Sequence, residues 1–261
     1  MKQTLLALSL AAAVGAFGVA NAGVLKVGAT PVPHSEILEH IQDSLLEKGV
    51  ELQITEFNDY VQPNIAVSDG ELDANFFQHQ PYLDVFVKDH GSDLVNVAGV
   101  HVEPMGIYAE SLKKLEDIKD GASVAIPNDP TNGGRALLLL AKAGLISVED
   151  PEDVTVTVLD IAQNPKNLKF QELEAAQLPR ALGDVDFAVI NTNYAIPAGL
   201  NPLKDALFIE DADSPYVNIL VANSKSAKNP DLQVLIEELT SKDTAKFIIE
   251  KYNGAVVPAV K

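Results

Sequence analysis

Short β-prone runs alternate with amphipathic helical patterns along most of the chain, and this alternation constrains the fold more than any other feature. The run Val24–Ala29 predicts a strand. His34–Lys48 predicts a helix, because its apolar side chains recur every three to four residues and so share one face. Alternating strands and helices are typical of parallel sheets covered by helices. The sequence therefore predicts an α/β fold.

The same patterns continue through the rest of the chain. Strands are predicted at Val50–Phe57, Asp73–Phe77, Leu94–Val102, Gly106–Ala109, Ser123–Ile126, Val154–Ile161, Leu168–Leu173, Phe187–Ile190 and Val217–Ala222. Helices are predicted at Pro81–His90 and Asn132–Ala143, with two more between Pro230 and Tyr252. No low-complexity segment or long linker separates these elements.

One short pattern occurs twice, each time just before a predicted strand. Gly-Glu-Leu-Asp at 70–73 precedes one strand, and Gly-Asp-Val-Asp at 183–186 precedes the strand at Phe187–Ile190. Two similar α/β halves would produce this repeat. A chance origin is equally open, because a glycine followed by an acid is common where a helix gives way to a strand.

The first residues have the features of a secretory signal. Lys2 is followed by an apolar stretch from Leu5 to Val19 and by the small-residue cleavage pattern Ala-Asn-Ala at 20–22. A membrane anchor is the disfavoured alternative, because the stretch is shorter than the ~20 apolar residues that span a bilayer. We therefore expect residues 1–22 to be a cleaved signal and the exported protein to begin at Gly23.

Charge and cysteine content exclude several classes of function. The chain carries 37 acidic and 19 basic residues, a net charge of −18. Such a polyanion would be repelled by nucleic acids and by anionic lipid surfaces. The absence of cysteine excludes disulfides, thiol catalysis and thiolate metal sites.

Aromatic and imidazole side chains are concentrated in the segment DANFFQHQPYLD, at 73–84. Phe76, Phe77, His79 and Tyr82 lie where a predicted strand gives way to a helix. Ligands bind at strand ends of open α/β sheets, and such rings suit a polarizable apolar group such as a thioether. The alternative is core packing for one of the two phenylalanines, since strand neighbours face opposite ways, and a structural role for His79.

A second segment, PNDPTNGGRALLLL at 127–140, follows the predicted strand Ser123–Ile126. Thr131 or Asn132 is expected to cap the helix, and Gly133–Gly134 would let backbone amides approach a ligand closely.

Arg135 lies in the first turn of that helix, where the helix dipole disfavours a cation. A bound carboxylate would remove the conflict, held by the guanidinium and by free backbone N–H groups. The alternative is an ion pair with a nearby acid such as Asp129.

Amides and one further ring follow other strands. Asn193 comes directly after the strand Phe187–Ile190, and Asn218 lies near the start of Val217–Ala222. Each amide can bond a polar ligand group or can simply form a turn. Tyr60 follows the second predicted strand and can be either a site residue or ordinary surface packing.

Common catalytic motifs are absent from the sequence: there is no GxSxG, P-loop, GxGxxG or HExxH pattern. The five histidines show no tight ligand spacing, so a zinc-binding receptor is a less favoured alternative; they are His34, His40, His79, His90 and His101. We therefore predict a binding protein and not an enzyme, with no metal ion or other cofactor.

Six segments, in this order, resemble the methionine-binding receptors of ABC importers, the NlpA lipoprotein family. They are FNDYVQPN, DANFFQHQPYL, HVEPMGIYAE, IPNDPTNGGRALLLL, NTNYA and YVNILVA. The resemblance runs from Gly23 to Val257, nearly the whole exported chain, and the second and fourth segments are highly specific.

The resemblance implies a type II periplasmic-binding fold, in which two α/β lobes are joined by two crossover segments. Residues 23–108 would form most of the first lobe and residues 109–215 the second, and residues 216–261 would return to the first. The crossovers are expected near Met105–Ala109 and Tyr216–Ala222. Such a receptor is expected to be a monomer in the periplasm and to serve a permease with separate ATPase subunits.

The resemblance also implies that methionine binds between the lobes. The residues expected to bind it are Tyr60, Phe77, His79, Tyr82, Arg135, Asn193 and Asn218. The first four would surround the thioether side chain, the arginine would hold the carboxylate, and the two asparagines would bond the polar end.

The chain departs from the family in lacking the lipidated cysteine. It would be free in the periplasm, or tethered by an uncleaved signal. Alternative ligands are a methionine-containing dipeptide or another apolar amino acid, in either L or D form. Alternative roles are a periplasmic enzyme that uses His79, and a sensor or adhesin component.

Overall fold

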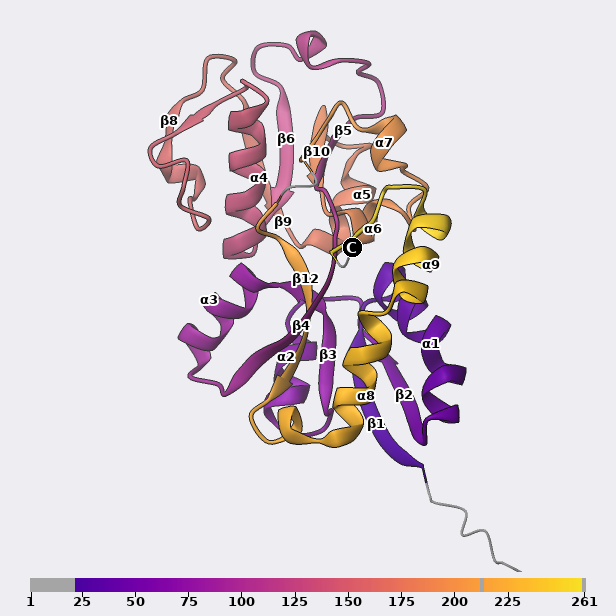
Figure 1. Cartoon of the computed structure of the whole chain (residues 1–261). Coiled ribbons are helices and arrows are strands. Elements are labelled where there is room, and N and C mark those ends of the chain that lie inside the picture. Colours follow the sequence, from indigo (N-terminus) through magenta and orange to yellow (C-terminus); the bar gives the residue numbers. More distant parts are fainter. Residues whose placement is uncertain (1–21, 212–213, 260–261) are drawn as a thin grey trace, which may run out of the picture.

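Two β-sheets, each covered by helices, form two lobes that face one another (Figure 1). The computed structural model describes residues 22–211 and 214–259. We call the six-stranded sheet and its helices the first lobe, and the five-stranded sheet and its helices the second lobe. The two-lobed α/β architecture is the one predicted from the sequence.

The first lobe is built from both ends of the chain. Its strands are β1 (Gly23–Ala29), β2 (Val50–Glu56), β3 (Ala74–His79), β4 (Leu94–Val102), β12 (Val217–Asn223) and β13 (Val257–Pro258). They are arranged in the order β13-β4-β12-β3-β1-β2. Its helices are α1 (Glu36–Glu47), α2 (Gln62–Ser68), α3 (Gln80–His90), α8 (Pro230–Leu239) and α9 (Lys242–Tyr252), with a one-turn segment at Pro31–Ser35 before α1.

The second lobe is built from the middle of the chain. Its sheet, in the order β11-β5-β10-β6-β9, contains β5 (Gly106–Tyr108), β6 (Ser123–Pro127), β9 (Lys169–Leu173), β10 (Phe187–Ile190) and β11 (Phe208–Ile209). Its helices are α4 (Pro130–Lys142), α5 (Leu178–Ala181), α6 (Thr192–Ala195) and α7 (Pro202–Asp205). A small separate hairpin pairs β7 (Ser147–Val148) with β8 (Ile161–Gln163).

The two sheets share one strand arrangement. In the first lobe, β2, β1 and β3 are parallel and β12 lies antiparallel beside β3. In the second lobe, β9, β6 and β10 are parallel and β5 lies antiparallel beside β10. Strands β3 and β10, which follow the repeated sequence pattern, therefore occupy equivalent places.

The acid at the end of each repeat makes the same backbone contact. Asp73 Oδ2 accepts a 2.8 Å hydrogen bond from the N–H of Lys26, and Asp186 Oδ2 accepts a 2.8 Å bond from the N–H of Ser123. Both donors lie on the parallel strand next to the one that the acid precedes. The equivalent contacts favour a duplicated α/β unit over a chance repeat.

Helix α1 shows why the apolar pattern gives this fold. Ile37, Leu38, Ile41 and Leu45 are the buried residues of the helix, and all four lie in the core of the first lobe. Full burial of such a side chain contributes about 1.5–3 kcal/mol. The C-terminal helix α8 packs beside α1, so the end of the chain completes the core that its beginning started.

The chain passes between the lobes twice. Strand β4 ends at Val102 in the first sheet and β5 begins at Gly106 in the second; β11 ends at Ile209 and β12 begins at Val217. Strand β5 pairs with β10 and so already belongs to the second sheet. The first passage between the lobes therefore lies between Val102 and Gly106, at the start of the crossover predicted at Met105–Ala109. We retain the division into 23–108, 109–215 and 216–261 as a proposal, with the first boundary favoured a few residues earlier.

The predicted strand at Val154–Ile161 is wrong. Most of this stretch forms turns and a 3-10 turn at Val158–Asp160, before β8 begins. The side chain of Asp160 accepts hydrogen bonds from the N–H and the hydroxyl of Thr157, both 2.7 Å long. These local bonds occupy backbone groups that a strand ladder would need.

No helix in residues 22–211 or 214–259 is long and apolar enough to cross a bilayer. The predicted signal, apart from Ala22, lies outside the described residues.

Candidate functional site

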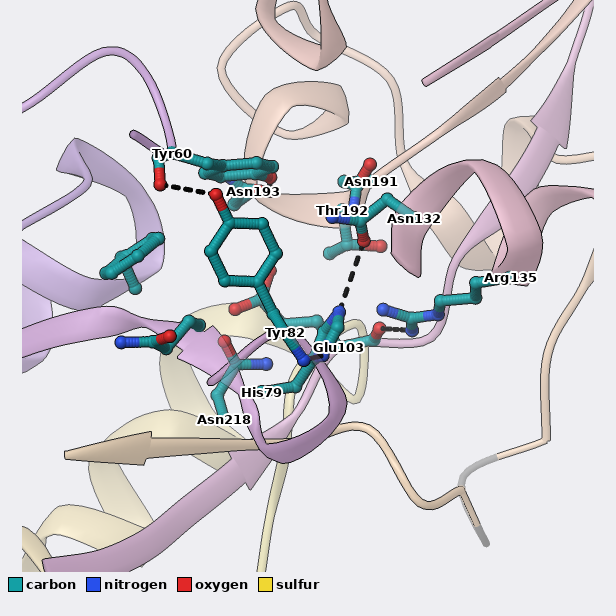
Figure 2. A pocket seen from close by; sticks show the side chains of 12 residues that line it. Tyr60, His79, Tyr82, Glu103, Asn132, Arg135, Asn191, Thr192, Asn193 and Asn218 are labelled. Carbon is teal, nitrogen blue, oxygen red and sulfur yellow. Dashed lines mark hydrogen bonds between the residues drawn. The ribbon is translucent and has the colours of Figure 1, made fainter. Parts of the chain in front are cut away.

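The ends of several strands meet around a partly open cavity between the lobes (Figure 2). The space free of protein atoms measures about 340 Å³ when the part open to solvent is included. The lining residues are Tyr60, Phe77, Gln78, His79, Tyr82, Glu103, Asn132, Arg135, Asn191, Thr192, Asn193 and Asn218. All seven residues predicted from the sequence are in this set, so the structure brings them together at one place.

Three rings from the first lobe form one wall of the cavity. The ring centroids of Tyr60 and Phe77 are 5.9 Å apart, those of Phe77 and Tyr82 5.8 Å, and those of Tyr60 and Tyr82 6.2 Å. The hydroxyl of Tyr82 donates a 2.7 Å hydrogen bond to the carbonyl oxygen of Tyr60. Phe76, which precedes Phe77 on β3, points to the opposite face of the sheet and is fully buried in the core of the first lobe.

His79 both caps a helix and joins the two lobes. Its Nδ1 atom accepts a 3.2 Å hydrogen bond from the N–H of Tyr82 at the start of α3. Its Nε2 atom lies 3.2 Å from Asn132 Oδ1 in the second lobe. Burial, and then the charge of Arg135, lower the pKa of His79 to about 3. The neutral ring therefore donates from Nε2 to the asparagine.

Arg135 makes an ion pair, but not with the acid considered from the sequence. Its Nε donates a 2.8 Å bond to Glu210 Oε1, and its Nη2 donates 2.5 and 2.8 Å bonds to Glu210 Oε2 and to the carbonyl oxygen of Glu103. The ring of Tyr216 stacks on the guanidinium, 4.2 Å from Cζ to the ring centroid. The side chain is 3% exposed and lines the cavity. The Nη1 group makes no hydrogen bond to either glutamate.

The start of α4 differs from the prediction. Asp129, and neither Thr131 nor Asn132, is the N-cap, because its side chain accepts a 2.9 Å bond from the N–H of Asn132. The glycines permit close approach of protein backbone rather than of a ligand. A Cβ at Gly134 would collide with the carbonyl oxygen of Val154.

Two asparagines after β10 present unpaired polar atoms in the buried lining. Asn193 Oδ1 accepts a 2.6 Å bond from the hydroxyl of Tyr60, whereas its Nδ2 is buried without a hydrogen-bond partner. Asn191 Nδ2 donates a 2.8 Å bond to Asn132, whereas its Oδ1 is buried without one. Buried polar groups are nearly always paired in native proteins. These atoms therefore indicate that a polar ligand completes the site.

Glu103 is the most important lining residue that sequence reasoning missed. This carboxylate lies between β4 and β5, where the chain passes from one lobe to the other, and is 5% exposed. Burial raises its pKa, and the nearby His34 and Arg135 act in the opposite direction. An acid directly after an apolar strand, in the segment HVEP, was the available signal.

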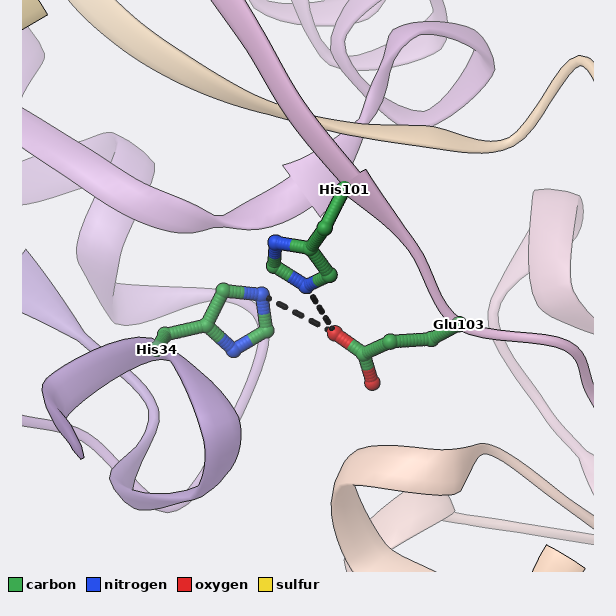
Figure 3. A group of neighbouring side chains, drawn as sticks. All are labelled: His34, His101 and Glu103. Atoms are coloured by element: carbon green, nitrogen blue, oxygen red, sulfur yellow. Dashed lines mark hydrogen bonds and ion pairs between the residues drawn. The ribbon is translucent and has the colours of Figure 1, made fainter. Parts of the chain in front are cut away.

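Two histidines that are distant in the sequence contact this carboxylate (Figure 3). His101 Nε2 lies 2.7 Å from Glu103 Oε1, and His34 Nε2 lies 3.2 Å from the same oxygen. His34 Nε2 is also 3.0 Å from Oδ1 of Asn218 on β12. Sequence spacing could indicate only the His101–Glu103 pair, which is two residues apart, because His34 and Asn218 come from distant parts of the chain.

Comparison with known proteins establishes the family. The family model described as NlpA lipoprotein matches residues 25–260. The chain belongs to the NlpA lipoprotein family. The two-lobed periplasmic-binding fold predicted from the resemblance is confirmed by the structures of other family members given below.

Three similar proteins are named as binding proteins. The D-methionine-binding lipoprotein MetQ of Salmonella typhi is 43% identical, over 95% of this chain and 96% of its own. A nutrient-binding protein from Burkholderia cenocepacia, solved bound to methionine, is 45% identical with a TM-score of 0.87, covering 90% of this chain and 99% of its own. A periplasmic substrate-binding protein of an ABC transporter from Coxiella burnetii is 42% identical with a TM-score of 0.86, covering 90% and 100%.

Proposed function

We propose that this protein captures methionine between its two lobes and delivers it to the membrane permease of an ABC importer, whose ATPase subunits are separate chains. The observation that carries the proposal is the cavity in which aromatic rings of the first lobe face Arg135 and unpaired amides of the second. An α-amino acid with an uncharged side chain needs this set of groups. The names of the methionine-binding relatives support the choice of ligand.

The rings of Tyr60, Phe77 and Tyr82 would hold the thioether side chain. Sulfur interacts favourably with the edges of aromatic rings at about 5 Å, worth about 0.3–1.5 kcal/mol. The centroids of the three rings are 5.8 to 6.2 Å apart, so the rings pack together as one apolar wall along which a linear thioether could lie.

The carboxylate of the ligand would bind to the second lobe. Two donors would hold it. The Nδ2 group of Asn193 has no hydrogen-bond partner, and the bonds of Arg135 to Glu210 use Nε and Nη2 but not Nη1. Hydrogen bonds between a guanidinium and a carboxylate are about twice as strong as neutral ones.

The ammonium group would bind where the first lobe meets the passage between the lobes. Both imidazoles contact Oε1 of Glu103, which leaves Oε2 for a ligand. The side-chain oxygens of Asn218 and Asn191 are further acceptors in the lining. A buried carboxylate paired with an ammonium satisfies the requirement that buried charges be compensated.

Binding would stabilise the closed arrangement of the lobes. Hydrogen bonds already connect Tyr60 with Asn193 and His79 with Asn132 across the gap. A ligand shifts an opening equilibrium only by its better contacts with the closed state. A molecule held by the rings on one side and by Arg135 on the other makes such contacts only when the lobes are closed.

The proposal is tested by releasing small molecules from the purified, denatured protein for mass spectrometry, and by calorimetric titration of ligand-free protein. We expect methionine in the released fraction and saturable binding of methionine. A panel of L-methionine, D-methionine, methionine-containing dipeptides and norleucine separates the related ligands. Binding of none of these, or turnover of a peptide or amide, would contradict the proposal.

We further propose that the protein acts in the periplasm as a monomer and is not an enzyme. The named relatives are substrate-binding proteins, several of them lipoproteins. The chain contains no cysteine that could carry the lipid. Cell fractionation and size-exclusion chromatography test location and oligomeric state.

A further inference from the structure

His34 contacts three different side chains although it does not line the cavity. Its Nδ1 atom lies 2.7 Å from the hydroxyl of Thr30, at the end of β1. Its Nε2 atom lies 3.0 Å from Asn218 Oδ1 and 3.2 Å from Glu103 Oε1. The side chain is 1% exposed. One ring therefore contacts two residues that line the cavity, Asn218 on β12 and Glu103 just after β4.

His101 supports the same carboxylate from a second direction (Figure 3). Its Nε2 atom lies 2.7 Å from Glu103 Oε1. The ring is fully buried, and its centroid lies 5.0 Å from that of His34 and 5.3 Å from that of Phe76. Phe76 in turn packs edge-on against His34, with 4.7 Å between the ring centroids. The two imidazoles are thus fixed against the core of the first lobe.

The partners of His34 determine which nitrogen carries the proton. Burial lowers the pKa of His34 to about 4 and that of His101 to about 3, so both rings are neutral at pH 7. A neutral imidazole has one N–H and one lone pair. Because Asn218 Oδ1 and Glu103 Oε1 are both acceptors, the N–H is at Nε2, and Nδ1 accepts from the hydroxyl of Thr30.

We propose that His34 and His101 are positioning residues for recognition of the ligand ammonium group. The Nε2–H of His101 donates to Oε1 of Glu103, and the Nε2–H of His34 donates to Oδ1 of Asn218 while lying 3.2 Å from the same Oε1, so that Oε2 of the glutamate faces the ligand. The inference rests on the proposed function, because it assigns the two histidines to the ammonium end of the amino-acid site. Neither histidine contacts the ligand directly.

A metal ion is the other chemistry that His34, His101 and Glu103 could support. One ligand atom from each lies within 4.8 Å of the others. A metal would take the lone pairs of both Nε2 atoms, whereas the hydrogen bonds of His101 to Glu103 and of His34 to Asn218 require N–H groups there. Metal-binding histidines also usually donate their other N–H to an acceptor, whereas His101 Nδ1 has no hydrogen-bond partner. These contacts favour the positioning role.

The test compares methionine with 4-(methylthio)butanoate, which has the same side chain and carboxylate but no amino group. His34→Leu removes the donor, and His34→Gln retains an N–H donor on a polar side chain. We expect His34→Leu to weaken methionine binding by about 10- to 100-fold, as for loss of a hydrogen bond to a charged group, with less than a threefold change for the analogue. His34→Gln should recover part of the loss.

Calorimetry measures both affinities, and thermal unfolding reports on folding. His40→Gln is the matched control, because His40 stacks on Phe247 at the surface of the first lobe and pairs with Asp243. It should leave both affinities unchanged. If His34→Leu proves too unstable, His101→Gln supplies the same comparison through the other imidazole.

Equal weakening of both ligands in His34→Leu would overturn the inference, because that result indicates general damage to the site. Unchanged methionine affinity would overturn it as well. So would one equivalent of zinc that copurifies with the wild type and is lost in the variant. If wild-type protein binds the analogue as tightly as methionine, the ammonium subsite itself is wrong; if it binds neither, the proposed function fails.

Discussion

The hydroxyl group of Tyr60 donates a 2.6 Å hydrogen bond to Oδ1 of Asn193, so a ring of the first lobe orients an amide of the second. With its oxygen engaged in this way, the asparagine turns its Nδ2 group into the buried lining, where it has no partner. One contact thus links lobe closure to the arrangement of a ligand-binding donor.

Tyr60→Phe tests this link, because the ring remains and only the hydroxyl is lost. Removal of one hydrogen bond costs about 0.5–1.5 kcal/mol, so we expect methionine to bind about 3- to 10-fold more weakly. Calorimetry measures the change. In a double-mutant cycle with Asn193→Ala the two losses should not add, and full additivity would show that the two residues act independently.

Arg135→Ala should have the largest effect on binding of any variant considered. Truncation of one partner of a buried charge pair costs about 2–5 kcal/mol, and here the ligand carboxylate would be left without its guanidinium. The loss should appear in calorimetry with methionine and be small with methioninamide, which lacks the carboxylate.

Lys142→Ala is the control for that variant, since it removes a cation from the same helix α4. Lys142 pairs with Asp211 at the exposed surface. Exposed ion pairs contribute about 0–1 kcal/mol, so binding and stability should hardly change. Tight methionine binding by Arg135→Ala would refute the role assigned to the arginine.

Acidification should destabilise the folded protein between pH 7 and pH 4. The pKa values of His34, His79 and His101 are lowered to about 4, 3 and 3, from an ordinary value of 6.5. In this window the unfolded chain therefore binds more protons than the folded one, and the free energy of unfolding falls as the pH falls. Each unit of pKa difference is worth about 1.4 kcal/mol.

Glu103 acts in the opposite sense, because its raised pKa lets the folded protein bind a proton before the unfolded chain does. Burial also raises the pKa of Asp129, which acts in the same sense as Glu103. Three histidines outweigh these two acids, so we expect a net loss of a few kcal/mol. Denaturant unfolding at pH 7.5, 6 and 5 measures it. His101→Gln should show a shallower dependence, and a flat profile for the wild type would show that the histidines are not held neutral.

Gly134→Ala should destabilise the second lobe without touching the cavity. The added methyl group would collide with the backbone at Val154, and such overpacking costs about 1–3 kcal/mol. Gly183→Ala is the matched control, because the nearest atom to its Cβ would be a side-chain oxygen of Glu110 at 3.9 Å. Thermal unfolding compares the two, and equal midpoints would contradict the expected clash.

Much of the fold could be predicted from local pattern. The strands at Leu94–Val102 and Phe187–Ile190 have the predicted bounds, since each is rich in apolar, β-prone residues and is followed by a polar residue. The strand predicted at Val154–Ile161 is absent because the N–H and hydroxyl of Thr157 donate to the side chain of Asp160 and form a local turn. A pattern of apolar residues does not reveal such side-chain bonds.

The site was predicted unevenly, for a physical reason. Residues in distinctive segments, such as Arg135 and His79, could be identified because their local context is unusual. His34 could not, because its role depends on Asn218 and Glu103, which only the fold brings beside it. His101 lies two residues before Glu103, but nothing in the local sequence shows that this carboxylate is buried at the site. Glu210 was missed likewise, since its partner Arg135 lies 75 positions earlier in the chain.

Glu210 already neutralises Arg135 in the structure. Methionine is a zwitterion with no net charge. Its carboxylate would pair with Arg135 and its ammonium group with Glu103, so the net charge of the site would not change on binding. The long-range electrostatic force between such a ligand and a protein of net charge −18 is small, whereas an anionic ligand would be repelled as it approached the cavity. Its association rate should therefore hardly depend on ionic strength, and capture should proceed alike in dilute and in salty surroundings.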